Sequence, residues 1–260
     1  MVRILSGAVL VVGVVASVWL LPSWALLLVT LAVLLLALVE YGRLATALGL
    51  RVPLAVAGAG AIAACAGAGL GAPLEAPLLA TFVVVGGVVV ASRAPEAGVL
   101  GEVGAALLPS LYLGLPLGAL VAVHAGWGRE AVLVLFLNVV LSDTAQYYGG
   151  RLFGRRPLSP LISPKKTVEG ALAGFLAAPP VVTLVGRAWL PWISPGRLFL
   201  VSMALVGLGI VGDLFESLLK RSAGLKDSSA LIPGHGGVLD RIDSLLFAAP
   251  GFYLFLCYAV

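Results

Sequence analysis

The stretch VGAALLPSLYLGLPLGALVAV, residues 103–123, contains no charged side chain. A helix needs about 20 mostly apolar residues to cross the hydrocarbon core of a bilayer, so this stretch is long enough to span a membrane. Similar runs precede and follow it. We predict nine membrane-spanning helices, over residues 3–21, 24–40, 52–71, 77–92, 103–123, 130–149, 168–189, 198–219 and 244–260. The expected fold class is an all-α, polytopic integral membrane bundle.

The composition supports this fold class. Of the 260 residues, 61% are hydrophobic and 11% are charged, whereas an ordinary soluble domain has about 25% charged residues. One soluble core could not bury so much apolar surface, which excludes most soluble folds, coiled coils and disorder. The net charge of +4 would suit a nucleic acid, but basic residues in a membrane protein usually set its orientation. We therefore expect no nucleic-acid partner.

The distribution of cations predicts the orientation. With nine spans, one side of the membrane receives the N-terminus and the loops 41–51, 93–102, 150–167 and 220–243. That side holds all but three of the 16 Lys and Arg residues. Because cytoplasmic loops are enriched in these residues, we predict a cytoplasmic N-terminus. The first span begins like a signal peptide, but no clean cleavage site follows it, so we expect an uncleaved helix.

The two parts of the chain differ in chemistry. Residues 1–130 are apolar and rich in Ala and Gly, and we expect them to serve packing, with a lipid or dimer surface as a further use. Segment 58–71, GAGAIAACAGAGLG, has the small-residue spacing that favours close helix packing in membranes. Residues 131–260 form the second predicted domain, with cytoplasmic loops 150–167 and 220–243. Residues 143–243 carry 18 of the 28 charged residues.

Two aspartates lie within predicted spans. Asp143 follows an apolar run, and Asp213 lies inside the eighth span. A carboxylate at such a depth is costly unless it faces protein, water or a cation. Asp213, Ser217 and Lys220 share one helix face. One interpretation is a structural ion pair, such as Asp213 with Lys220, and the other is a polar cavity that opens toward the cytoplasm.

The loop 220–243 reads KRSAGLKDSSALIPGHGGVLDRID. Asp240 and Asp243 can share a face if the ninth helix begins early. Carboxylate oxygens suit Mg²⁺, which usually takes one or two of them together with substrate phosphates and water. The glycine-rich stretch 233–237 can bring backbone amides close to a phosphate, and a turn without a ligand is the alternative. His235 has no second His or Cys at zinc spacing.

The loop 150–167 reads GRLFGRRPLSPLISPKKT. Ser163 and Pro164 predict a helix start, with Ser as N-cap and Pro at the first helical position. Lys165 and Lys166 would then stand at a helix N-terminus, a place that disfavours cations unless an anion binds there. The sequence leaves two interpretations open, a phosphate site and a purely topological role for these lysines.

Three blocks of residues form a longer pattern. The first contains Ser217, Lys220-Arg221, Lys226-Asp227 and PGHGGVLDRID over 233–243. The second contains Ser142-Asp143, Tyr147, Gly150-Arg151 and SPKKTVEG over 163–170, and the third is GDLFES over 212–217. These blocks resemble the signature of the phosphatidate cytidylyltransferases, also called CDP-diacylglycerol synthases. The resemblance covers roughly 138–243, whereas residues 1–130 match only as apolar helices.

This resemblance implies an activity and a site. The family transfers the cytidylyl group of CTP to phosphatidic acid, which gives CDP-diacylglycerol and pyrophosphate in phospholipid biosynthesis, and it requires a divalent cation, usually Mg²⁺. The implied catalytic residues are Asp213, Asp240, Asp243 and Ser217, with Asp213 and Asp240 as metal ligands. The candidate substrate-binding residues are Asp143, Lys165, Lys166, Lys220, Arg221, Lys226, His235 and Arg241. The resemblance leaves a second cation and a homodimer open.

Two other functions compete with this hypothesis. A related CTP-dependent lipid kinase would release CDP, and a secondary transporter would use Asp143 and Asp213 as ion sites. The charges gather toward one side and the two halves of the chain are unlike, which favours the transferase over the transporter. Because no obvious transit segment is present, we expect a bacterial inner membrane with the active site facing the cytoplasm.

Overall fold

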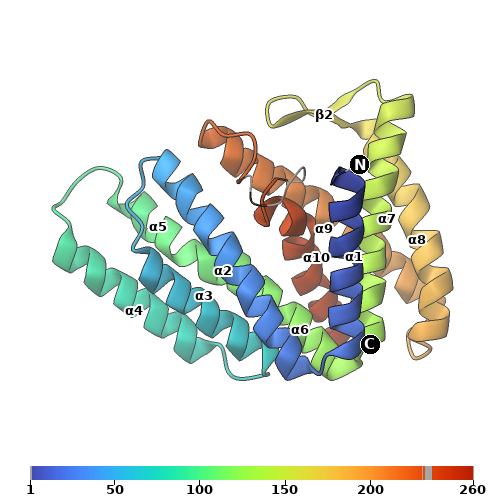
Figure 1. Ribbon diagram of the computed structural model, residues 1–260, viewed down its shortest axis with the longest axis horizontal. Coiled ribbons are helices and arrows are strands. Elements are labelled where there is room, and N and C mark those ends of the chain that lie inside the picture. Colours follow the sequence, from blue (N-terminus) through green and yellow to red (C-terminus); the bar gives the residue numbers. More distant parts are fainter. Residues whose placement is uncertain (1, 230, 232–235, 260) are drawn as a thin grey trace. The chain divides into compact units, whose positions relative to one another are not determined.

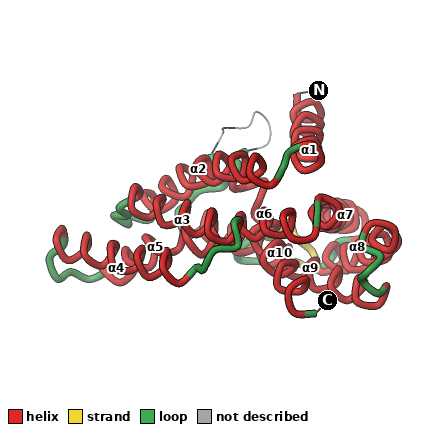
Figure 2. Tube along the Cα trace, turned by 90° about the horizontal axis from the view of Figure 1, so that it is seen from below, coloured by secondary structure: helices red, strands yellow, loops and turns green. Residues whose placement is uncertain are grey.

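The computed structural model describes residues 2–229, 231 and 236–259, and helices make up most of them (Figure 2). Each of the nine predicted ranges falls on a helix, and the fifth consists of α5, a short π-helical turn η1 and α6 in succession. The helices are α1 (Val2–Leu20), α2 (Ser23–Ala47), α3 (Leu54–Gly69), α4 (Glu75–Ser92), α5 (Val99–Pro109), η1 (Ser110–Gly114), α6 (Leu115–Trp127), α7 (Arg129–Phe153), α8 (Val168–Trp189), α9 (Pro195–Ser222) and α10 (Leu239–Tyr258).

Within the described residues, six helical stretches are long and apolar enough to cross a membrane. They are α2, α4, the continuous run Val99–Trp127, α7, α8 and α9. Helices α1 and α3 contribute shorter apolar stretches, Val9–Leu20 and Leu54–Gly69. The chain is therefore an all-α membrane protein, as its composition predicts. The count of nine spans and the orientation remain predictions.

The run Val99–Trp127 stays helical although it contains proline. Pro109 has no N–H, so it cannot donate to the carbonyl of Ala105, four residues earlier. The Tyr41 hydroxyl of α2 donates to that carbonyl at 2.7 Å. The π-helical turn η1 follows Pro109 immediately, as expected where the regular hydrogen-bond ladder is interrupted. Tyr41 thus satisfies the carbonyl that proline leaves open.

The chain divides into two compact units. Unit 1 comprises Met1–Ala125 and Leu219–Arg241, and unit 2 comprises Gly126–Leu218 and Ile242–Val260. Most of the loop 220–243 therefore lies in the same unit as the N-terminal helices. Each unit contains residues that the sequence singles out for chemistry, so we describe the two units separately.

Small residues let the helices of unit 1 approach closely. The structure places α3 against the run that contains η1 and α6. A Cβ atom added at Gly114 or Gly118 would lie 2.5 Å from the carbonyl oxygen of Ala61 or Cys65, respectively, both on α3. The close packing predicted for segment 58–71 is confirmed, because no side chain fits at these two crossing points.

In unit 2, α7 and α8 lie side by side along their length (Figure 1). Glycines permit this approach as well: a Cβ at Gly170 would lie 2.7 Å from the backbone oxygen of Gln146 on α7. Between the two helices, β1 (Pro157–Ser159) pairs antiparallel with β2 (Ser163–Thr167).

The hairpin corrects one sequence prediction. Ser163 and Pro164 do not begin a helix; they lie in β2, and α8 begins at Val168. Thr167 is the N-cap, and its hydroxyl accepts a hydrogen bond from the Gly170 amide at 3.1 Å. Thr167 caps the helix in place of the predicted Ser163 because the strand pairing holds the residues before Thr167 in an extended conformation. Lys165 and Lys166 therefore stand on a strand.

We expect Gly118→Ala to destabilise the protein by about 1–3 kcal/mol, because the added methyl group would force apart two backbones that already touch. Gly104→Ala is the matched control, since a Cβ there meets nothing within 4 Å, and alanine has the higher helix propensity. Thermal unfolding in detergent measures both variants. Equal melting temperatures for the two would contradict the close packing of α3.

Candidate functional site

The Asp213 cluster is the polar centre of unit 2. Helix α9 carries Asp213, and its Oδ2 atom pairs with the Nζ atom of Lys166 on β2. The Ser217 hydroxyl, one helical turn further along α9, donates to Oδ1 of Asp213 at 3.4 Å. The side chains of Asp213 and Lys166 are 34% and 23% exposed. The ion pair is therefore accessible to solvent and to a ligand.

Asp243 belongs to the same cluster. Burial, together with the negative charges of Asp213 and Asp143, raises the pKa of Asp243 to about 7. Gly212 allows this proximity, because a Cβ there would lie 2.5 Å from the backbone oxygen of Asp243. The negative charges of Asp213 and Asp143 and the positive charge of Lys166 all act on Asp243, so the carboxyl groups of this cluster outnumber Lys166. A cation is the ligand that such a charge distribution favours.

The Asp240 cluster is the polar centre of unit 1, and Asp240 belongs to the segment Leu219–Arg241 of that unit. Asp240 lies in the first turn of α10, where the helix dipole favours an acidic side chain. Oδ1 of Asp240 pairs with Nζ of Lys220, and the two side chains are only 8% and 9% exposed. Oδ2 accepts hydrogen bonds from the Gly237 amide at 2.8 Å and from the Ser228 amide at 3.1 Å.

These contacts determine the charge state of Asp240. Burial alone would raise its pKa, but the hydrogen bonds from Lys220 and Gly237, with the positive charge of Lys220, outweigh burial and hold the pKa below its usual range. Asp240 is therefore ionised at neutral pH. An ionised carboxylate is the form that binds a metal ion.

One residue of the Asp240 cluster escaped the sequence prediction. Glu40, on α2, is 2% exposed, and its carboxylate accepts hydrogen bonds from the amides of Val238 and Leu239 at 2.9 and 2.8 Å. We expected residues 1–130 to serve packing, with a lipid or dimer surface as a further use, and none of them to belong to the site. The signal was present, since a carboxylate at the end of an apolar span calls for a partner.

The other predicted site residues have varied surroundings. Arg221 is exposed and donates to the carbonyl of Leu225 at 2.8 Å. Four more of the predicted site residues have exposed side chains: Asp143, Lys165, Lys226 and Arg241. His235 lies outside the described residues.

Glu169, in the first turn of α8, holds the base of the hairpin. Its Oε2 atom accepts from the amides of Arg155 and Arg156 at 2.9 and 3.1 Å. These bonds tie the segment that enters β1 to the helix that follows β2. Glu169 therefore holds the two ends of the hairpin that carries Lys166. Its hydrogen bonds to Arg155 and Arg156 involve neither Lys166 nor Asp213.

The donor chemistry of both clusters fits a hard divalent cation. Among the residues that the structure describes, no three His, Cys, Asp or Glu side chains gather into a protein cage for a metal. Mg²⁺ seldom uses such a cage and binds one or two carboxylates together with phosphates and water. Asp213 and Asp240 offer oxygen ligands of this kind.

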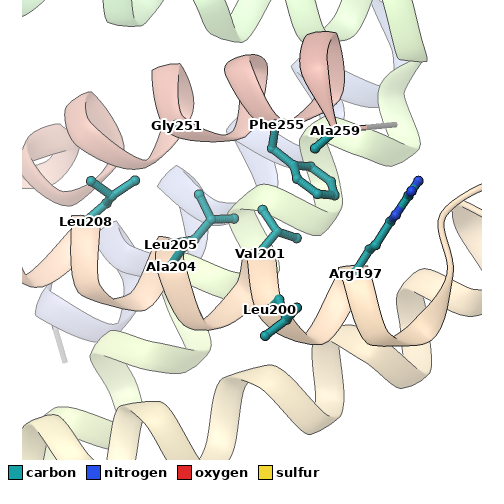
Figure 3. Close-up of a pocket in the computed structure, with 9 residues that line it drawn as sticks. All are labelled: Arg197, Leu200, Val201, Ala204, Leu205, Leu208, Gly251, Phe255 and Ala259. Carbon is teal, nitrogen blue, oxygen red and sulfur yellow. The ribbon is translucent and has the colours of Figure 1, made fainter.

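Unit 2 also contains an apolar groove, which is separate from the Asp213 cluster. A cavity of about 350 Å³ lies between α9 and α10, lined mainly by apolar side chains such as Leu205 and Phe255, with Arg197 at one end (Figure 3). The residues that line it include none of the predicted site residues. The groove suits hydrocarbon rather than phosphate chemistry.

Fold and clusters together define a class: a helical membrane protein with paired carboxylates and lysines suited to a cation and phosphates. The family model described as the cytidylyltransferase family matches residues 1–259, and the chain belongs to that family. The family resemblance is thereby confirmed.

Several curated relatives share the name phosphatidate cytidylyltransferase. The protein from Helicobacter pylori is 43% identical over 153 residues, which cover 59% of this chain and 57% of that protein. The Haemophilus influenzae protein is 41% identical over 142 residues, 51% of this chain and 48% of that protein. The chloroplastic phosphatidate cytidylyltransferase 5 of Arabidopsis thaliana is 44% identical over 140 residues, 51% of this chain and 34% of that protein. The chain thus spans little more than half of these relatives at most.

Proposed function

We propose that the protein transfers the cytidylyl group of CTP to phosphatidic acid and forms CDP-diacylglycerol and pyrophosphate in phospholipid biosynthesis. The observation that carries the proposal is that acidic and basic motif residues form two carboxylate–lysine pairs, Asp213 with Lys166 and Asp240 with Lys220. Carboxylates for a cation and ammonium groups for phosphates are what a triphosphate and a lipid phosphate require together. The names of the relatives support the same activity.

In the proposed reaction, a phosphate oxygen of phosphatidic acid attacks the α-phosphorus of CTP. A new P–O bond forms, the bond to the β-phosphate oxygen breaks, and pyrophosphate leaves with the electron pair. The attacking phosphate is already anionic at neutral pH, so no strong general base is needed. The protein contributes positioning and charge neutralisation, which dominate phosphoryl-transfer catalysis.

The proposed roles follow from the contacts. Asp213, in unit 2, and Asp240, in unit 1, would each offer a carboxylate to Mg²⁺, which would offset the charge of the triphosphate. Ser217 orients Asp213 through its hydrogen bond, and Asp243, which lies within electrostatic reach of Asp213, would complete or orient the same shell. The ammonium groups of Lys166 and Lys220 then turn to phosphate oxygens. The remaining cations, Arg221, Lys226 and Arg241, together with Lys165 and His235, stay candidates for the two phosphate-bearing substrates.

We further propose nine spans with the N-terminus in the cytoplasm, an inner-membrane location in a bacterium and an active site open to the cytoplasm. The gathering of Lys and Arg on one predicted side supports this orientation. Soluble CTP reaches such a site directly, and bacterial relatives support the location. A second cation and a homodimer stay expectations from the family resemblance.

The experiment that tests the function uses detergent-purified protein, phosphatidic acid, Mg²⁺ and CTP labelled at the α- or γ-phosphorus. We expect the α-label to enter the lipid and pyrophosphate to be released. Transfer of the γ-label to a lipid with release of CDP would identify a lipid kinase instead. No transfer to any lipid would overturn the proposal and favour a transporter.

Asp213→Asn and Asp240→Asn should each lower kcat at least about 100-fold, because each variant removes a charge that a bound cation requires. Glu75→Gln, on the exposed start of α4, is the control and should keep wild-type turnover. Gel filtration and circular dichroism verify folding of each variant. Near-normal turnover of a folded variant would remove that aspartate from the metal role.

The double variant Lys165→Ala with Lys166→Ala should raise the KM of at least one substrate about tenfold, since it removes charge-assisted bonds to phosphate. Of the single variants, Lys166→Ala should account for most of the effect, because Lys166 pairs with Asp213 whereas Lys165 is exposed. Arg187→Ala, predicted on the opposite side of the membrane, is the control. An unchanged KM and kcat in the double variant would leave these lysines a role in topology alone.

A further inference from the structure

We propose that Glu40 is a positioning residue of the active site: its carboxylate, on a membrane helix, fixes the loop that carries Asp240. The activity part of this inference rests on the proposed function. The contact itself is a structural claim that can be tested whether or not the protein transfers cytidylyl groups.

Glu40 lies in the last third of α2, and both of its oxygens are occupied. Oε1 accepts from the Val238 amide at 2.9 Å and from the Ser229 hydroxyl at 2.5 Å. Oε2 accepts from the Leu239 amide at 2.8 Å and from the Ser228 hydroxyl at 2.9 Å. The carboxylate therefore binds two separate segments of the loop 220–243.

All four of these partners are donors, which explains why a carboxylate is needed. An ionised carboxylate is an acceptor at both oxygens, whereas a glutamine amide would present an NH₂ group to donors at one of them. The two amides belong to the start of α10, where N–H groups lack partners within the helix. Glu40 thus supplies from α2 the cap that α10 needs.

Ser228 links Glu40 to Asp240. The Ser228 hydroxyl lies 2.9 Å from Oε2 of Glu40 and 2.9 Å from Oδ2 of Asp240. A hydroxyl has one proton, so it can donate to only one of these carboxylates at a time. The backbone amide of Ser228 also donates to Asp240, at 3.1 Å. A displacement of Ser228 would therefore move two donors of Asp240 together.

Gly237 leaves the room that this arrangement requires. A Cβ atom on Gly237 would overlap the Ser228 hydroxyl and Oε2 of Glu40. The Gly237 amide itself donates to Asp240 at 2.8 Å. The position of Asp240 thus depends on three parts of unit 1 that meet at one point: α2, residues 228–229 and residues 237–239.

The test compares Glu40→Gln with Glu75→Gln, an exposed glutamate of the same unit, in the full-length protein. In Glu40→Gln, the amides of Val238 and Leu239 should exchange hydrogen about 10- to 100-fold faster, the range that the loss of bonds to a charged group implies. Its kcat should fall about tenfold or more, since small misplacements of a catalytic group are costly, while the KM of phosphatidic acid stays within about twofold. Glu75→Gln should match wild type in all three measurements.

A second pair of variants separates positioning from folding. Ser228→Ala and Ser229→Ala each remove one hydroxyl donor from Glu40, but only Ser228 also contacts Asp240. Ser228→Ala should lower kcat more than Ser229→Ala does. Glu40→Asp should recover part of the kcat that Glu40→Gln loses, because it keeps the charge and both acceptor oxygens.

Three results would overturn the inference. Unchanged exchange at Val238 and Leu239 in Glu40→Gln would exclude the contact. Faster exchange with wild-type kcat would exclude the positioning role. If Glu40→Gln does not fold, equal kcat values for Ser228→Ala and Ser229→Ala would exclude the positioning role of Glu40. Absence of cytidylyl transfer in the wild-type protein would instead refute the proposed function and leave the exchange result valid.

Discussion

A carboxylate in an apolar helical protein persists only where cations or hydrogen-bond donors surround it, and this constraint organises both polar clusters. Charged side chains within membrane spans are costly, and each one needs a specific partner. Asp213 has Lys166, and Asp240 has Lys220 with backbone amides. Glu40 is satisfied by two amides and two hydroxyls. The helices, the hairpin and the loop 220–243 hold these partners in place.

The kind of partner separates two roles. A lysine is a flexible point charge, so a carboxylate paired with it can exchange that lysine for another cation while the ammonium group turns to a phosphate. A carboxylate bound by backbone amides cannot exchange its partners unless the backbone itself moves. Asp213 and Asp240 each have a lysine partner, and Asp240 has backbone amides besides. The described hydrogen bonds of Glu40 come from two backbone amides and two serine hydroxyls, with no lysine among them. This difference is the physical reason to assign chemistry to the aspartates and positioning to Glu40.

The sequence predicts the helices well because an apolar run of sufficient length has few alternatives in a bilayer. It predicts the hairpin poorly, because Ser163 and Thr167 are both good N-caps and only strand pairing selects between them. The types and spacing of the acidic and basic motif residues drew attention to them, and the family resemblance implied their roles in the site. Their pairing was not predicted: the ion pair suggested for Asp213 was with Lys220, whereas the structure pairs Asp213 with Lys166, from a strand that sequence reasoning took for a helix start.

Glu40 and Gly237 show why part of the site is not predictable from a local motif. Within the stretch 233–237, the glycines invite a local explanation, namely close approach of the backbone to a phosphate. In the structure, Gly237 is constrained by a side chain almost 200 positions earlier, because any Cβ would displace the Glu40 carboxylate and Ser228. The glycine at position 237 is thus required because the Glu40 carboxylate occupies the space that a side chain there would need. The sequence alone explains neither Gly237 nor Glu40, because the steric conflict arises only where the folded chain brings Glu40, Ser228 and Gly237 together.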